Sequence, residues 1–234
     1  MTGLAVFDLD GTLVDTPGAI VAAFSAAFGA MGVAAPEAAV IRATVGLPLQ
    51  QAFGDLLRVA PDDPQAALGV QHYQAVFREL VLPEAAALVF PGVADGLAAL
   101  RAEGFTLAVA TSKFQASAEA LLTSAGLRDH FSLVVGADQV TRPKPDPEMG
   151  LVVLRELDFP ARSAVMVGDT THDLLMAAAA GMRSIAVTYG VHSRSELLPA
   201  GPTWLADSFD DVLGCLRAAR SDLMGAGLAS PVQG

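Results

Sequence analysis

The sequence predicts an α/β protein, in which a parallel sheet covered by helices on both faces is interrupted by an all-helical insertion. From residue 93 onward, short apolar runs alternate with helical patterns, as in parallel strands joined by helices. Residues 17 to about 86 instead carry helical patterns with no strand among them. Of the 234 residues, 53% are hydrophobic and 17% are charged, so the chain can bury a large core.

The N-terminal part combines one strand with the helical insertion. Residues 4–7 form an apolar run typical of a buried parallel strand. Thr16-Pro17 then resembles an N-cap followed by proline at the first helical position, and apolar residues recur at helical spacing to about Gly32. Pro83 and the Pro91-Gly92 turn bracket the return to the sheet. Between these points, further helices are expected over residues 36–44, 49–59 and 64–82.

The alternating part is expected to supply the rest of the sheet. Strands are predicted over residues 105–110, 132–135, 164–167, 184–187 and 203–205. Helices are predicted over residues 93–103, 114–124, 147–157, 173–180 and 210–223, several of them stopped by glycine. The expected domains are a sheet domain (residues 1–16 and 87–224), a helical domain (residues 17–86) and a frayed tail (residues 225–234).

Two aspartates, Asp8 and Asp10, stand directly after the first predicted strand. Carboxylates placed where a buried strand ends are costly unless something neutralises them. A cation would do so and would leave one carboxylate free to attack an electrophile. An ordinary acidic turn is the alternative, because Asp-Gly is a common turn dipeptide.

Polar and charged residues also follow later strands. Thr111-Ser112 follows the second predicted strand, Lys144 lies in the loop after the third, and Asp169 and Asp173 follow the fourth. Ligand sites of open parallel sheets form beyond the carboxyl ends of the strands, so we expect these side chains to meet. Of the 14 basic residues only Lys113 and Lys144 are lysines, which points to positions that need a compact ammonium.

Charge and hydropathy narrow the classes of partner. The formal net charge of −11 argues against nucleic acid and anionic membranes as binding partners. Binding of an anionic substrate would need positively charged groups at the site. No apolar run approaches the ~18 residues of a membrane span. Met1-Thr2-Gly3 lacks the basic region of a signal peptide, and the single Cys215 cannot form an internal disulfide. We therefore expect a cytoplasmic protein that acts on a small metabolite, as a monomer or homodimer.

The chain resembles the haloacid dehalogenase superfamily in four motifs that occur in the family's order and strand context. They are Asp8-x-Asp10-Gly11-Thr12, Thr111-Ser112-Lys113, Lys144-Pro145 and Gly168-Asp169-Thr170-x-x-Asp173. The helical insertion resembles the C1 cap of that superfamily, and the likeness to phosphoglycolate phosphatases spans nearly the whole chain. The resemblance implies a Rossmann-like core with a helical cap and a phosphatase activity that needs Mg²⁺.

It also implies roles in catalysis. Asp8 would be the nucleophile that forms an aspartyl-phosphate. Asp10 would protonate the leaving oxygen and then deprotonate the attacking water. Thr111, with backbone amides near Ser112, would bind the phosphoryl oxygens, and Lys144 would neutralise the charge that develops on them.

The same resemblance implies a magnesium site. Mg²⁺ would be held by the Asp8 carboxylate, the Asp10 backbone carbonyl and the Asp169 carboxylate. Asp173 would orient a metal-bound water. Asp169 could instead cap the following helix, and capping can coexist with ligation.

Among the reactions of this superfamily, hydrolysis of a small, phosphoglycolate-like phosphomonoester is expected. Dehalogenases lack the second aspartate, and C1 phosphonate hydrolases use a cap lysine, which residues 17–90 do not contain. Hexose-phosphate mutases, less expected, usually have a histidine where Ile20 stands. Pyrophosphatase, 5′-nucleotidase and sugar-phosphate phosphatase activities remain alternatives. A non-enzymatic scaffold would be favoured by loss of a motif residue, and all are present.

The cap is expected to set specificity by closing over the leaving group. Its most loop-like part, residues 45–49, resembles the specificity loop of the family and includes Gly46. The cap holds three cationic residues, Arg42, Arg58 and Arg78. Arg42, just before the loop, is a candidate for meeting a second anionic group such as a carboxylate. The alternative is a solvated helix-face arginine. Whether Lys113 contacts substrate is left open.

Overall fold

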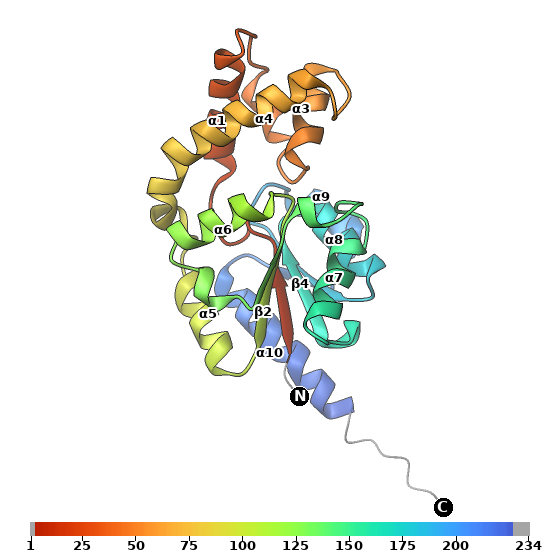
Figure 1. Cartoon of the computed structure of the whole chain (residues 1–234). Coiled ribbons are helices and arrows are strands. Elements are labelled where there is room, and N and C mark those ends of the chain that lie inside the picture. Colours follow the sequence, from red (N-terminus) through yellow and green to blue (C-terminus); the bar gives the residue numbers. More distant parts are fainter. Residues whose placement is uncertain (1–2, 227–234) are drawn as a thin grey trace, which may run out of the picture.

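A six-stranded parallel sheet forms the centre of the computed structural model, which describes residues 3–226 (Figure 1). Its strands are β1 (Leu4–Phe7), β2 (Thr106–Ala110), β3 (Leu133–Val135), β4 (Ala164–Gly168), β5 (Arg183–Val187) and β6 (Trp204–Ala206). Every neighbouring pair is parallel. The order β3-β2-β1-β4-β5-β6 is that of the Rossmann fold. The predicted α/β fold class is confirmed.

Helices cover both faces of the sheet, as the apolar strand sequences require. They are α5 (Val93–Ala102), α6 (Gln115–Ser124), α7 (Glu148–Glu156), α8 (Thr171–Ala179) and α10 (Phe209–Ala226), with a short α9 (Arg194–Leu197). Alternate residues of β1 face opposite cores. Ala5 and Phe7 pack in the core that includes α5 and α10 residues, whereas Leu4 and Val6 pack in the core that includes α7 and α8 residues.

The insertion forms a helical group beyond the sheet (Figure 1). It contains α1 (Pro17–Ala30), α2 (Ala38–Arg42), α3 (Leu49–Leu57) and α4 (Pro64–Val76), followed by a π-helical turn (Phe77–Val81) and a 3-10 helix (Leu82–Leu88). Its own core is aromatic: the ring centroid of Phe24 lies 4.6 Å from that of Phe53 and 4.9 Å from that of Tyr73. We refer to residues 17–86 as the cap, and its exact boundaries stay a prediction.

The two segments that join the cap to the sheet domain run side by side. The backbone N–H of Asp15 donates to the Leu88 carbonyl (2.7 Å), and that of Phe90 donates to the Leu13 carbonyl (3.1 Å). Val14 and Val89 form an antiparallel bridge between these bonds. The cap therefore enters and leaves the sheet domain at one place, directly after the first motif.

The structure differs from the sequence prediction mainly at element ends. The helix predicted to run to residue 82 ends at Val76 and gives way to the π-helical turn, in which the Leu82 N–H bonds the Phe77 carbonyl. Pro83, which lacks an N–H, cannot continue an α-helix. Helix α9 was not predicted, nor were the short 3-10 turns Arg128–His130, Ala137–Gln139, Ala161–Ser163 and Leu198–Ala200.

At the C-terminal end, α10 extends to Ala226, so residues 225 and 226, predicted as tail, belong to a helix. The remaining predicted tail, residues 227–234, lies outside the described residues. Among the residues that the structure describes, no helix combines the length and the apolar character needed to cross a membrane.

Two glycines of the cap allow a matched test of its packing. A Cβ at Gly69 of α4 would lie 2.4 Å from the Phe53 ring, whereas a Cβ at Gly29 of α1 would meet nothing within 4 Å. Alanine gains up to ~1 kcal/mol of helix propensity over glycine, but overpacking a core costs about 1–3 kcal/mol. We expect Gly69→Ala to lower the free energy of unfolding and Gly29→Ala to leave it unchanged or raise it, as measured by urea denaturation. Equal stabilisation by both would contradict the tight contact.

Candidate active site

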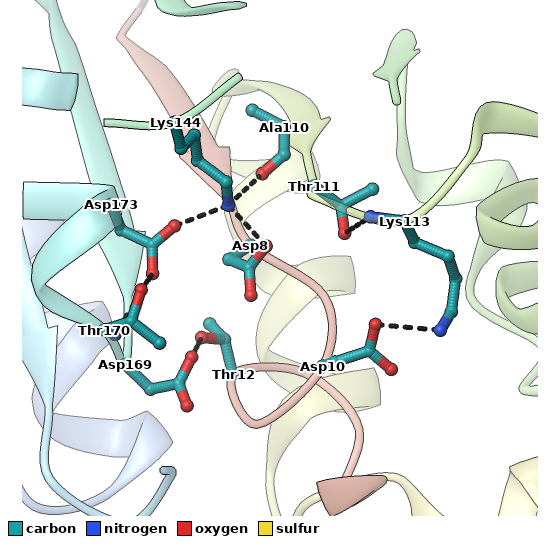
Figure 2. Close-up of polar contacts among 10 residues, drawn as sticks. All are labelled: Asp8, Asp10, Thr12, Ala110, Thr111, Lys113, Lys144, Asp169, Thr170 and Asp173. Carbon is teal, nitrogen blue, oxygen red and sulfur yellow. Dashed lines mark hydrogen bonds and ion pairs between the residues drawn. The ribbon is translucent and has the colours of Figure 1, made fainter. Parts of the chain in front are cut away.

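The first motif forms a tight turn directly after β1 (Figure 2). Gly11 adopts a positive φ of 87°, which glycine tolerates without strain, and its N–H donates to the Val14 carbonyl at 2.8 Å. The turn leaves Asp8 at the strand end with 5% of its surface exposed. The Asp8 N–H still bonds the Val167 carbonyl of β4 at 2.9 Å, so the sheet holds the backbone of this residue.

Lys144 is a buried cation that joins two of the motifs. Its ammonium lies 2.8 Å from Asp8 Oδ1 and 2.6 Å from Asp173 Oδ1, and it donates to the Ala110 carbonyl at 3.1 Å. These three acceptors use all three N–H donors of the ammonium. Burial alone would lower the pKa of Lys144, but the carboxylates of Asp173 and Asp8 outweigh it and raise that pKa above its ordinary value. Lys144 is therefore positively charged.

Burial acts on Asp8 in the opposite direction. It raises the pKa of Asp8 to about 7, and the nearby Asp173 and Asp10 carboxylates add to this rise, while the Lys144 ammonium opposes it. An ionised Asp8 thus depends on cationic neighbours.

Asp169 is fully buried in the segment between β4 and α8. Its Oδ1 accepts from Thr12 Oγ1 at 3.0 Å, and its Oδ2 accepts from the Val191 N–H at 2.8 Å. Burial, together with the Asp8 and Asp173 carboxylates, raises the pKa of Asp169 well above its ordinary value. Two glycines make room for this side chain, because a Cβ at Gly11 or at Gly190 would lie 2.3 Å from Asp169 Oδ2.

Asp173 stabilises the start of α8 as well as the Lys144 ammonium. Its Oδ2 accepts from the Thr170 N–H at 3.1 Å and from Thr170 Oγ1 at 2.7 Å. Thr170 is the N-cap residue of this helix. The alternative that Asp169 caps the helix is therefore wrong, and its carboxylate instead accepts from Thr12 Oγ1 and the Val191 N–H.

Three carboxylates are arranged as a possible metal-binding group. Asp8, Asp169 and Asp173 each offer one carboxylate oxygen, and these oxygens lie within 4.8 Å of one another. Only one ammonium, that of Lys144, contacts them among the described residues, so ionisation of all three carboxyls would leave a net negative charge in a buried place. A divalent cation with a preference for oxygen ligands fits both the donor set and this imbalance.

The carboxylate of Asp10 points away from this group (Figure 2). Its Oδ1 accepts from Thr16 Oγ1 at 2.6 Å, and its Oδ2 lies 3.0 Å from the Lys113 ammonium. That ammonium also lies 4.4 Å from the ring centroid of Phe77 in the cap. The sequence singled out Lys113 without giving it a partner, and the structure places it between Asp10 and the cap.

The second motif leaves hydrogen-bonding capacity beside Asp8. Thr111 is buried, and its hydroxyl accepts from the Lys113 N–H at 3.2 Å. The Ser112 hydroxyl is buried and has no hydrogen-bond partner among the described residues. A buried hydroxyl without a partner is costly, so this one points to a ligand with acceptor oxygens.

A cavity of about 320 Å³ lies between the sheet domain and the cap. Asp8, Asp10, Thr111 and Ser112 line its sheet side. The loop predicted to set specificity lines its cap side: Gly46, with a positive φ of 98°, sits where a Cβ would lie 3.2 Å from the Thr170 side chain.

The structure corrects the prediction that Arg42 is the cap residue that meets an anionic group of the substrate. Arg42 is exposed at the end of α2 and does not line the cavity, whereas Arg78 of the π-helical turn does. Spacing from the loop favoured Arg42, but the direction of an arginine on a helix surface depends on how the cap helices pack.

Comparison with protein families and with curated proteins gives consistent matches. A family model described as haloacid dehalogenase-like hydrolase matches residues 5–187. The "Probable phosphatase IndB" of Dickeya dadantii (strain 3937) is 53% identical over 218 residues, covering 93% of this chain and 95% of its own length. The phosphoglycolate phosphatase of Salmonella typhi is 31% identical over 242 residues, covering 92% of this chain and 93% of its own length.

Solved structures share the fold over nearly the whole chain. A predicted phosphatase from Clostridium acetobutylicum has a TM-score of 0.81 at 25% identity, covering 93% of this chain and 99% of that one. CbbY from Rhodobacter sphaeroides, solved in complex with xylulose-(1,5)-bisphosphate, has a TM-score of 0.76 at 30% identity, covering 89% of this chain and 95% of that one.

Proposed function

The chain belongs to the haloacid dehalogenase-like hydrolases and is a phosphatase, and we propose that it hydrolyses a small phosphomonoester with Mg²⁺ by way of an aspartyl-phosphate on Asp8. The observation that carries this proposal is the position of Asp8. Its carboxylate is fixed by the Lys144 ammonium at 2.8 Å and lines the same cavity as the unpartnered hydroxyl of Ser112. A nucleophile and a hydrogen-bond donor for phosphoryl oxygens thus face one space.

Asp8, Asp169 and Asp173 would hold the metal ion, since their carboxylate oxygens gather within 4.8 Å. By the family resemblance, the Asp10 backbone carbonyl would complete the protein ligands. The family resemblance gave Asp173 the role of orienting a metal-bound water. Because its carboxylate lies in the same group as those of Asp8 and Asp169, Asp173 is as well suited to bind the metal directly. Bound Mg²⁺ supplies positive charge that neutralises the phosphoryl oxygens and favours the ionised carboxylates.

The chain's own residues would perform two displacements. A carboxylate oxygen of Asp8 attacks phosphorus, the ester P–O bond breaks, and Asp10 gives a proton to the leaving oxygen. Water then attacks the phosphorus of the aspartyl-phosphate, Asp10 takes a proton from that water, and the bond between phosphorus and the Asp8 oxygen breaks to release phosphate. Lys144, whose ammonium holds the attacking carboxylate, would neutralise the charge that develops on the phosphoryl group, and the hydroxyls of Thr111 and Ser112 would donate to the phosphoryl oxygens.

Within the phosphomonoesters, phosphoglycolate-like acids are supported by the relatives that carry that activity in their names. A nucleoside monophosphate, pyrophosphate and a sugar phosphate remain alternative substrates. Hexose-phosphate mutase activity has less support. Such mutases usually have a histidine at the position of Ile20, which is an apolar residue that lines the cavity. A cytoplasmic location, and a monomer or homodimer, stay predictions from the sequence.

Replacement of the nucleophile gives the first test. We expect Asp8→Asn to lower kcat/KM by at least ~10³-fold, because an amide cannot attack phosphorus. The variant should fold, since burial already disfavours the Asp8 charge. Asp15→Asn, an exposed residue of the same segment, is the control and should keep its activity. Steady-state kinetics and circular dichroism of the three proteins check this, and substantial activity in Asp8→Asn would exclude the aspartyl-phosphate route.

Metal exchange gives the second test. Removal of divalent ions with a chelator should abolish turnover, Mg²⁺ should restore it, and Ca²⁺ should not. Ca²⁺ has longer bonds and looser coordination, which would misplace the Asp8 carboxylate relative to phosphorus. The measurement is turnover of a phosphate ester at increasing concentrations of each ion. Full activity in excess chelator would contradict the metal proposal.

Crowding of Asp169 gives the third test. A Cβ at Gly190 would lie 2.3 Å from Asp169 Oδ2, so Gly190→Ala should displace this carboxylate. We expect the concentration of Mg²⁺ for half-maximal activity to rise by ~10-fold or more, the range for disturbed ligand positions. Gly214→Ala, in an exposed turn of α10 where a Cβ meets nothing within 4 Å, should leave it unchanged. The thermal shift that Mg²⁺ produces should fall in parallel. Unchanged Mg²⁺ dependence in Gly190→Ala would remove Asp169 from the site.

A further inference from the structure

The cap side of the cavity is built mainly from apolar side chains, with Thr44, Gln74 and Arg78 among them. Five of the apolar side chains belong to the cap, Ile20, Phe24, Leu49, Tyr73 and Phe77, and Phe114 of the sheet domain adds a sixth apolar side chain to the lining. In the proposed reaction, the phosphoryl group occupies the side of the cavity lined by Asp8 and Ser112. The apolar side is then left for the group that departs with the ester oxygen.

Aromatic rings give this wall a defined shape. The Tyr73 ring centroid lies 4.9 Å from that of Phe24 and 5.7 Å from that of Phe77, and Phe53 supports Phe24 from behind at 4.6 Å. These spacings are those of favourable aromatic pairs, so the rings hold one another in place. A planar ring that enters the cavity therefore meets preformed aromatic surface.

The charged residues of the lining do not favour an additional anion. Two cations line the cavity, Lys113 and Arg78. Lys113 is already paired with Asp10 at 3.0 Å. Arg78 is exposed, so water screens the attraction of its charge for an anion. Asp138 adds a carboxylate to the lining. A carboxylate or second phosphate on the leaving group would lose hydration against apolar walls and gain little in return.

The size of the cavity also argues against a very small leaving group. A cavity of about 150 Å³ holds benzene, and the space here is about 320 Å³. One phosphoryl group together with one ring would fill it, whereas a two-carbon acid would leave apolar surface uncovered.

From these observations, and resting on the proposed phosphatase reaction, we propose that the substrate is a phosphate monoester whose leaving group is uncharged and carries an apolar or aromatic ring, which packs against Phe24, Leu49 and Phe77. This proposal narrows the range of candidate substrates among the phosphomonoesters. It argues against phosphoglycolate and sugar bisphosphates as preferred substrates.

Three alkyl esters with similar leaving oxygens test the proposal: 2-phenylethyl phosphate, ethyl phosphate and phosphoglycolate. Burial of a phenyl group should raise kcat/KM for the 2-phenylethyl ester by at least ~10-fold over that for ethyl phosphate. Phosphoglycolate should be no better than ethyl phosphate. A higher kcat/KM for phosphoglycolate than for the 2-phenylethyl ester would overturn the inference while leaving the phosphatase proposal intact.

Two leucines of α3 supply matched variants. Leu49 lines the cavity and Leu56 does not, although both are partly buried. Asparagine keeps the branching and the number of side-chain heavy atoms of leucine but makes the surface polar. Leu49→Asn should lower the ratio of kcat/KM between the 2-phenylethyl and ethyl esters by ~5-fold or more, and Leu56→Asn by less than ~2-fold. Equal changes in both variants would show that the cavity wall does not select the ring.

Binding to the Asp8→Asn protein separates recognition from turnover. Calorimetry in Mg²⁺ should give a lower Kd for 2-phenylethyl phosphate than for phosphoglycolate, whatever the rate of hydrolysis. The reverse order of Kd would overturn the inference on its own. If that order holds and wild type hydrolyses none of the three esters, the proposed function fails although the cavity still prefers the ring.

Discussion

The ion pairs of Lys144 are the constraint on which the rest of the site depends. A single buried ammonium holds Asp8 at 2.8 Å and Asp173 at 2.6 Å, and it also bonds the Ala110 carbonyl. Breaking a buried pair costs more than forming it gains, because the remaining charge is left without a partner. Without Lys144, Asp8 and Asp173 would face each other and Asp169 as buried carboxylates, so Asp8, the proposed nucleophile, would be neither fixed nor ionised.

The order of the strands explains how distant motifs come to share this ammonium. Because β1 lies between β2 and β4, the residues that follow these three strands meet at one edge of the sheet. Asp8, Thr111 and Asp169 occupy those positions, and the loop after β3 carries Lys144 across to the end of β2, where it meets the Ala110 carbonyl. The sheet thus fixes the backbone positions of these residues, whereas the cap is inserted as a separate group of helices directly after the first motif.

The difference between the sheet domain and the cap also explains which features of the site could be predicted from the sequence. The residue after a buried strand has its place set by topology, so Asp8 and Asp169 could be brought together from their order alone, and Lys144 was placed near them because it lies in the loop that follows another strand of the sheet. The direction of a side chain on a cap helix is set by packing between helices, which spacing does not contain. That is why Arg42 was preferred over Arg78. The unpartnered Ser112 hydroxyl and the pairing of Asp10 with Lys113 likewise require coordinates.

Lys113 connects the two parts of the molecule. Its ammonium pairs with Asp10 of the sheet domain and lies over the ring of Phe77 in the cap. Phe77 in turn stacks on Tyr73, and both rings line the cavity. The Phe77 side chain therefore forms part of the apolar wall and also covers the cation that pairs with Asp10, the proposed acid–base residue. A cation over an aromatic face is attracted more strongly as water is excluded, so a cap closed over an apolar leaving group would also hold Lys113, and with it Asp10, in place.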